Sequence, residues 1–139
     1  MGTNRNDLLK SMSPVTSQCL KERGYISFVD VLIGMEKLSA RDYEDWRFKR
    51  IPYLEKAIKI NLSQINFLLR SLHKNSLNGK LKPSVTAYVS WGKGKKSNLR
   101  FSKFGDHNLE RAYSTHYVKS EQNKLVQVNV DSATLHPRA

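Results

Sequence analysis

The chain lacks the residues and segments that would mark it as a secreted, metal-binding or membrane protein. Its single cysteine, Cys19, excludes an internal disulfide and any zinc site built from several cysteines. The apolar run at residues 67–69 is interrupted by Asn66 and Arg70, and no stretch approaches the roughly 18–20 apolar residues of a membrane span. The first residues also contain no apolar segment typical of a signal sequence. We therefore expect a cytoplasmic protein without a membrane segment.

Carboxylates are absent from the middle of the chain. Glu55 and Asp106 are separated by 50 residues that contain no Asp or Glu but eleven Lys and Arg residues. Residues 1–55 contain nine basic and eight acidic side chains, and residues 106–139 contain four of each, so the middle segment carries almost the whole net charge of +12. Because like charges repel each other in a compact protein, this segregation predicts a polyanionic partner. A general preference for lysine would be the simpler explanation.

The chain of 139 residues is long enough for one domain with short tails. We expect a flexible N-terminal segment at residues 1–20, with one helical turn before Pro14. A single globular α+β domain follows at residues 21–118. Residues 119–139 are a polar tail, in which residues 125–130 alternate in polarity and would suit an edge strand or a contact with a partner.

Two Ser-x-x-Asp patterns predict the starts of short helices. Ser27 with Asp30 opens a helix that ends near Met35, and Ser39 with Asp42 opens another over residues 40–48. In the second helix the acids precede the bases Arg47, Lys49 and Arg50, an order that complements the helix dipole and predicts a structural role.

A third and longer helix is predicted from Pro52 to about Asn75. Its apolar residues recur at helical spacing and form one stripe, which consists of Leu54, Ile58, Leu62, Ile65, Leu69 and Leu72. The opposite face carries the basic residues Lys56, Lys59, Arg70 and Lys74. Asn78 and Gly79 would provide the left-handed stop.

After Pro83 the pattern changes to the period of two that strands show. Residues 85–91 and 99–104 predict two strands of a hairpin, joined by a Gly- and Lys-rich turn at residues 92–98. Asp106 would cap a short helix, and Thr115–Val118 predicts a further short strand. The expected fold is thus α+β: a three-helix unit with a long third helix, followed by a basic β-hairpin and a short helix.

The hairpin combines cations with aromatic residues. Lysines beside Gly92 and Gly94 would follow a phosphate backbone, because glycine allows the main chain to approach phosphate oxygens. Trp91, Phe101 and Phe104 are expected mainly in the core, although exposed rings would stack on unpaired bases. The predicted nucleic-acid-binding residues are Lys93, Lys95, Lys96, Arg100, Lys103, Lys56, Lys59, Arg70, Lys74 and Trp91, converging on one positive face.

The order of three helices and a basic hairpin resembles that of a winged helix. In that fold the third helix enters the major groove and the hairpin contacts the flanking backbone. Gln64, Asn66 and Arg70 would then be candidates for reading bases. The resemblance lies in the order of elements alone.

No catalytic motif is complete. Residues 92–97 lack the spacing of a phosphate-binding P-loop, and a strand rather than a helix follows them. His107 and His116 match no metal-site spacing, and no cofactor is implied. We therefore expect a non-enzymatic nucleic-acid-binding protein. The alternatives are an adaptor that binds an acidic protein through the Trp46 and Tyr53 region and the tail, and an enzyme that depends on the two histidines.

Overall fold

The computed structural model describes residues 4–119 and confirms the α+β class. Five α-helices, one 3-10 helix and a three-stranded sheet make up this part of the chain. Their order is α1 (Arg5–Arg23), β1 (Tyr25–Ser27), α2 (Phe28–Gly34), α3 (Ala40–Arg47), η1 (Leu54–Ala57), α4 (Leu62–Asn78), β2 (Lys82–Val85), α5 (His107–Ser114) and β3 (Thr115–Val118). None of these helices is both long enough and apolar enough to cross a membrane.

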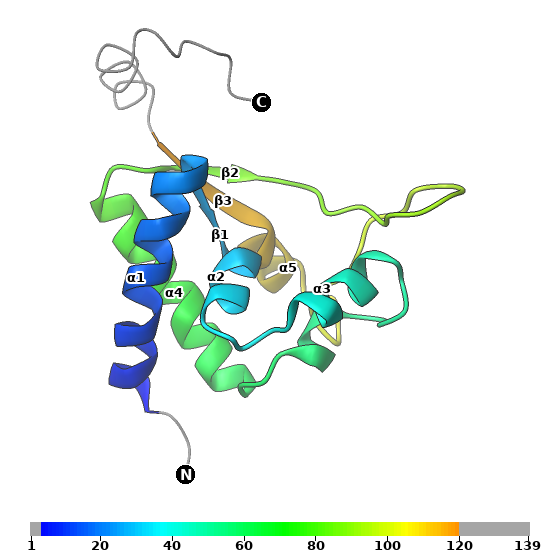
Figure 1. Cartoon of the computed structure of the whole chain (residues 1–139), viewed down its shortest axis with the longest axis horizontal. Coiled ribbons are helices and arrows are strands. Elements are labelled where there is room, and N and C mark those ends of the chain that lie inside the picture. Colours follow the sequence, from blue (N-terminus) through cyan, green and yellow to red (C-terminus); the bar gives the residue numbers. More distant parts are fainter. Residues whose placement is uncertain (1–3, 120–139) are drawn as a thin grey trace, which may run out of the picture.

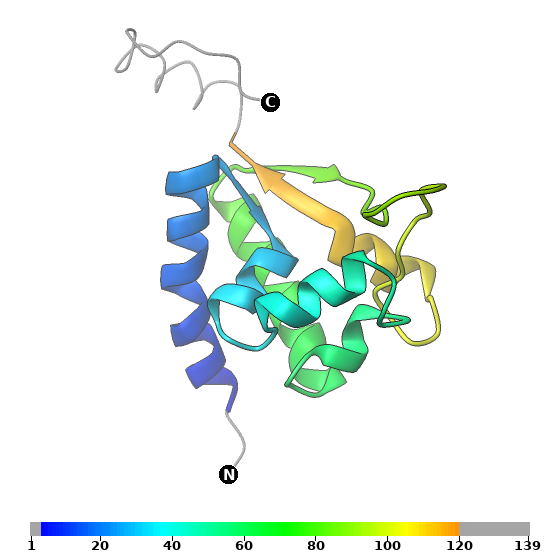
Figure 2. The ribbon, with the colours of Figure 1, turned by 45° about the vertical axis from the view of Figure 1, so that its right-hand side comes forward.

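The strand predicted at Thr115–Val118 forms the centre of the sheet. β3 pairs antiparallel with both other strands, so the order is β1–β3–β2. Figures 1 and 2 show the sheet at one end of the long helices α1 and α4. β1 was not predicted, because three residues are too few to display an alternating pattern.

The N-terminal segment is a helix, and the prediction of a flexible stretch over residues 1–20 is wrong for the residues described. α1 spans 19 residues with Pro14 in its interior. It buries Leu8, Met12 and Cys19, and it contacts α2, β1 and α4. This burial on both sides of Pro14 compensates for the hydrogen bond that a proline removes from a helix.

The helices predicted from capping patterns are confirmed. Ser27, Ser39 and Asp106 each accept a hydrogen bond from the backbone N–H three residues later, and they cap α2, α3 and α5. These signals lie within one turn of the helix that they start, and longer-range packing does not override them.

The third helix begins about ten residues later than predicted. Residues 54–57 form only a 3-10 turn, and α4 starts after a capping box in which Asn61 and Gln64 each accept from the other's backbone N–H. The apolar stripe is therefore broken, and Leu62, expected in the core, is 50% exposed. At the C-terminal end it is Lys80, with φ +63°, and not Gly79, that adopts the left-handed conformation.

The predicted hairpin has far fewer paired residues than expected. β2 occupies residues 82–85, and between residues 86 and 105 only Val89 and Asn98 form a bridge. Residues 99–104 do not form the returning strand, because their backbone groups bond elsewhere. The carbonyl of Arg100 accepts from Leu54 N (3.2 Å) and from the Trp46 indole (2.8 Å), and the carbonyl of Phe101 accepts from Glu55 N (2.8 Å).

An aromatic cluster fixes this irregular loop to the helices. Trp46 is fully buried, with its ring centroid 5.0 Å from that of Phe101 and 5.8 Å from that of Tyr88. Phe101 stacks on Tyr113 of α5 at 5.0 Å, and Tyr113 in turn contacts Phe28 of α2. Residues 88–101 are therefore held against α3 and α5 by a core, although they form almost no ladder.

Candidate nucleic-acid interface

The structure divides the ten predicted binding residues into separate groups. In Figures 1 and 2 the long loop after β2 (residues 86–106) and the chain between α3 and η1 lie together at one end of the molecule. The C-terminal half of α4, which carries Arg70 and Lys74, lies at the opposite side next to α1. The backbone N–H of Lys59 donates to the carbonyl of Lys37 (2.8 Å), in the segment between α2 and α3. A single face uniting all ten residues is not formed.

The tip of the loop docks on the end of α3. The backbone N–H of Trp91 donates to the carbonyl of Arg47 (2.7 Å), and the rings of Trp91 and Phe48 are 5.7 Å apart. Gly92 has φ +98°, and a Cβ there would lie 3.4 Å from the Phe48 ring. This contact brings the lysines of the tip next to the last residues of α3.

The positively charged end that results contains cations assigned above to a structural role. We call it the basic end, and it consists of Arg47, Lys49, Arg50, Lys56, Lys93, Lys95, Lys96, Arg100 and Lys103. All except Arg47 are exposed. Sequence analysis missed Arg47, Lys49 and Arg50 because they lie outside the carboxylate-free segment, and only the contact between Phe48 and Trp91 joins them to it.

Each exposed Phe, Tyr or Trp ring among the described residues lies in the basic end and has a cation over it. Phe48 is 38% exposed, with the Arg50 guanidinium 4.9 Å from its centroid. Trp91 is also 38% exposed, with Arg47 at 4.6 Å. Phe104 is 88% exposed, with Lys103 at 5.3 Å. The expectation that the loop aromatics are core residues is therefore correct for Phe101 and wrong for Trp91 and Phe104.

The guanidinium group of Arg47 packs against aromatic rings. Its guanidinium carbon lies 4.6 Å from Trp91, 5.3 Å from Tyr88 and 5.9 Å from Tyr43, measured to the ring centroids. Its Nε is buried without a hydrogen-bond partner. Among the described residues, ion pairs join Arg23 to Asp30 and Arg50 to Asp45, and neither involves Arg47. An unneutralised cation therefore lies directly beneath the lysine-rich tip.

Two carboxylates near the basic end, Glu110 and Glu55, face inward and anchor its loop, whereas Asp45 pairs with Arg50. Glu110 accepts from the backbone N–H groups of Phe101 (3.0 Å) and Ser102 (2.6 Å) and from the Ser102 hydroxyl. Glu55 accepts from Lys103 N (3.2 Å) and from the Tyr113 hydroxyl (3.1 Å). Burial, together with the nearby Glu55, raises the pKa of Tyr113. These carboxylates position the loop by accepting hydrogen bonds from its backbone N–H groups.

The backbone of the tip has free hydrogen-bond donors. Gly92 and Gly94 have φ of +98° and +95°, and Lys96 Nζ donates to the carbonyl of Gly92 (2.6 Å). Within residues 4–119, the backbone N–H groups of residues 92–96 donate to no protein acceptor. Successive free N–H groups beside lysines are groups that can bind phosphate oxygens.

His73 and His116 have structural partners, whereas His107 is exposed at the start of α5. His116 Nε2 lies 2.8 Å from the Tyr88 hydroxyl, its ring stacks on Tyr25 at 5.1 Å, and burial lowers its pKa. His73 Nδ1 lies 3.0 Å from the Tyr117 hydroxyl. Within residues 4–119 no three His, Cys, Asp or Glu side chains are grouped so that they could hold a metal ion. Cys19 is buried, and its pKa is raised mainly by that burial.

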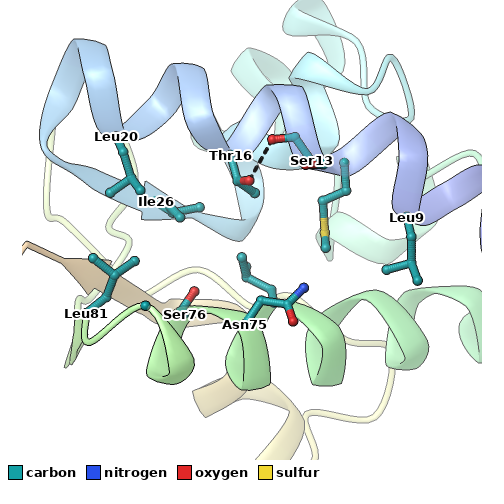
Figure 3. A pocket seen from close by; sticks show the side chains of 11 residues that line it. Leu9, Ser13, Thr16, Leu20, Ile26, Asn75, Ser76 and Leu81 are labelled. Atoms are coloured by element: carbon teal, nitrogen blue, oxygen red, sulfur yellow. Dashed lines mark hydrogen bonds between the residues drawn. The ribbon is translucent and has the colours of Figure 1, made fainter.

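A groove of about 380 Å³ lies between α1 and α4, away from the basic end (Figure 3). Most of its lining is aliphatic, with Ser13, Thr16, Asn75 and Ser76 as polar residues. Ser76 Oγ points into it and is buried without a partner. Because no cation lines the groove, it does not suit a polyanion.

No family model, curated protein or solved structure matches the chain. Conclusions about function therefore depend on the geometry of the chain itself.

Proposed function

We propose that the chain is a nucleic-acid-binding protein whose binding surface is the basic end. The observation that carries the proposal is the combination of nine cations, of which Arg50 is paired with Asp45, with three exposed aromatic rings. Glu55 and Glu110 beside them are occupied by internal hydrogen bonds. Lys93, Lys95 and Lys96, with the free N–H groups of the tip, would contact phosphates. Arg47 would add a guanidinium that its aromatic surroundings already hold in place.

The other cations predicted from sequence have a lesser part in this proposal. Arg70 and Lys74 belong to the half of α4 that lies at the other side of the molecule from the tip, so the proposal does not place them on the same short stretch of nucleic acid. Gln64, a candidate base reader in a winged-helix arrangement, accepts a hydrogen bond from Asn61 in the capping box of α4. A winged-helix docking mode through α4 is therefore the less favoured version of the proposal.

The test is the salt dependence of binding, measured by fluorescence anisotropy of labelled oligonucleotides. Replacing Lys93, Lys95 and Lys96 by Ala removes three phosphate contacts and should flatten the slope of log K against log salt by about 2–3. The matched control replaces Arg70, Lys74 and Lys82, which lowers the net charge equally on the other side and should change the slope little.

Two outcomes would contradict the proposal. One is equal loss of affinity in the two triple variants, because binding would then follow net charge and not location. The other is binding of polyglutamate as tight as that of an oligonucleotide, which would favour an acidic protein as the partner.

A further inference from the structure

The three exposed aromatic rings of the basic end indicate which form of nucleic acid it binds. Phe104 is 88% exposed, and no other large apolar side chain of the described residues exceeds 55%. A single exposed apolar residue needs no explanation. Here, however, each of the three exposed rings has a cation within 5.3 Å of its centroid. Aromatic faces combined with cations are what proteins use to bind unpaired bases.

Duplex and single strand present different chemistry to such a surface. In a duplex the bases are stacked inside, and a protein reaches only their edges and the phosphates. In a single strand each base also offers its flat face, which stacks on Phe, Tyr or Trp. A duplex would use the lysines of the basic end and leave the exposed rings without a partner.

The loop presents Phe104 in a fixed position. Gly105, with φ +68°, follows it, and Gly105 N donates to Ser102 Oγ (3.1 Å). Ser102 is in turn bonded to Glu110, and Lys103 N to Glu55. Because these hydrogen bonds fix the backbone on both sides of Phe104, only the side-chain torsions of its ring remain to be ordered when a base stacks on it.

We propose that the basic end binds single-stranded nucleic acid in preference to duplex, with bases stacking on Phe104 and Trp91 while the lysines contact the phosphates between them. This inference rests on the proposed function and specifies its ligand.

The two tryptophans provide a direct assay. Trp46 is fully buried, whereas Trp91 is 38% exposed, so a quencher in solution reaches mainly Trp91. The probes are dT and rU oligomers of about 12 nucleotides and a duplex of the same length. Both oligomers should quench the Trp91 fluorescence and bind more tightly than the duplex. A Trp91→Phe variant, which retains only Trp46, should show no quenching.

Substitution of Phe104 separates stacking from simple apolar contact. Phe104→Ala should weaken binding of both oligomers by roughly five- to 150-fold, the range that corresponds to one lost base stack. Phe104→Leu keeps an apolar side chain without a ring and should behave like Ala, whereas Phe104→Tyr should bind like the unmodified chain. None of these changes should alter duplex binding appreciably.

The results distinguish failure of this inference from failure of the proposed function. If duplex binds as tightly as the oligomers and Phe104→Ala changes nothing, but the triple lysine variant still loses affinity, single-strand recognition is overturned and nucleic-acid binding stands. If neither nucleic acid binds, both proposals fail. Binding that Phe104→Leu fully restores would also overturn the stacking mechanism.

Discussion

Glu110→Gln tests whether the basic end acts by position or only by charge. The substitution removes one carboxylate and therefore raises the net charge of +12 by one. If charge alone determined affinity, this variant would bind polyanions more tightly. At about 10 Å in water one unit charge is worth about 0.4 kcal/mol, so the gain would be at most roughly two-fold.

The hydrogen bonds of Glu110 predict the opposite outcome. Its carboxylate accepts from Phe101 N, Ser102 N and the Ser102 hydroxyl, and the amide of Gln would present an NH₂ group to some of these donors. Leaving a buried donor unsatisfied costs about 1–3 kcal/mol, and these donors are only partly buried, so we expect a loss of about 1–2 kcal/mol of folding free energy. A domain with about 5–15 kcal/mol of stability should remain folded.

Loosening the loop should weaken binding although the charge rises. Arg100, Lys103 and Phe104 would lose their fixed position, and we expect single-strand affinity to fall by roughly five-fold or more, which corresponds to loss of one stacking contact. Anisotropy titrations measure the affinity, urea denaturation the stability, and circular dichroism the folded state.

The matched control is Glu44→Gln. Glu44 is exposed, lies on α3 near the basic end, and makes no side-chain hydrogen bond or ion pair among the described residues. It changes the charge equally without touching the loop, so affinity should stay the same or rise slightly. The reasoning is refuted if Glu110→Gln binds as tightly as Glu44→Gln while urea denaturation confirms its loss of stability.

Three further predictions concern the fold. Gly34→Ala should destabilise the chain by about 1–3 kcal/mol in urea denaturation, because its Cβ would lie 2.5 Å from Cγ1 of Val15, a stiff β-branched side chain. Burial lowers the pKa of His116 below 6.5, so the unfolded chain takes up a proton first and stability should fall as the pH drops below that value. His116→Gln should show a smaller loss between pH 7 and 5. Ser76→Ala removes an unpartnered buried hydroxyl and should change the unfolding free energy by no more than about 1 kcal/mol, in the stabilising direction; a clear destabilisation would show that the hydroxyl has a partner.

Features whose signal is local could be predicted from the sequence. Ser27, Ser39 and Asp106 each bond within three residues, so the starts of α2, α3 and α5 can be read from short patterns. The strand Thr115–Val118 was also identified, although its place at the centre of the sheet depends on partners far away in the chain.

Features determined by distant contacts could not be predicted. Residues 99–104 alternate in polarity like a strand, but their backbone groups bond to Glu55, Leu54 and Trp46, which lie more than 40 residues earlier. Pro14 would end an isolated helix, but packing of α1 against α2, β1 and α4 keeps the helix continuous. Alternation also cannot distinguish the buried Phe101 from the exposed Phe104, because exposure depends on where Trp46 and Tyr113 lie.

Two lysines in strained backbone conformations allow stability and binding to be separated. Lys49 and Lys80 both follow helix ends with φ near +65° and +63°, a region that costs a non-glycine residue about 1–2 kcal/mol. In each case the next residue, Arg50 or Leu81, closes the helix end with a hydrogen bond to the carbonyl five residues back. Glycine at either position should therefore relieve the strain and stabilise the chain by up to about 1 kcal/mol, after the entropy cost of glycine.

The two substitutions remove the same charge at different places. Lys49 lies in the basic end next to Phe48, whereas Lys80 lies beyond α4 at the other side of the molecule. We expect Lys49→Gly to raise the urea midpoint and lower single-strand affinity by roughly two- to five-fold, since loss of one phosphate contact flattens the salt slope by about 0.7. Lys80→Gly should raise the midpoint similarly and leave affinity nearly unchanged. Equal loss of affinity in both variants would mean that affinity follows the net charge of the chain. The basic end would then not be the binding surface, because removing a cation from it would weaken binding no more than removing the charge of Lys80.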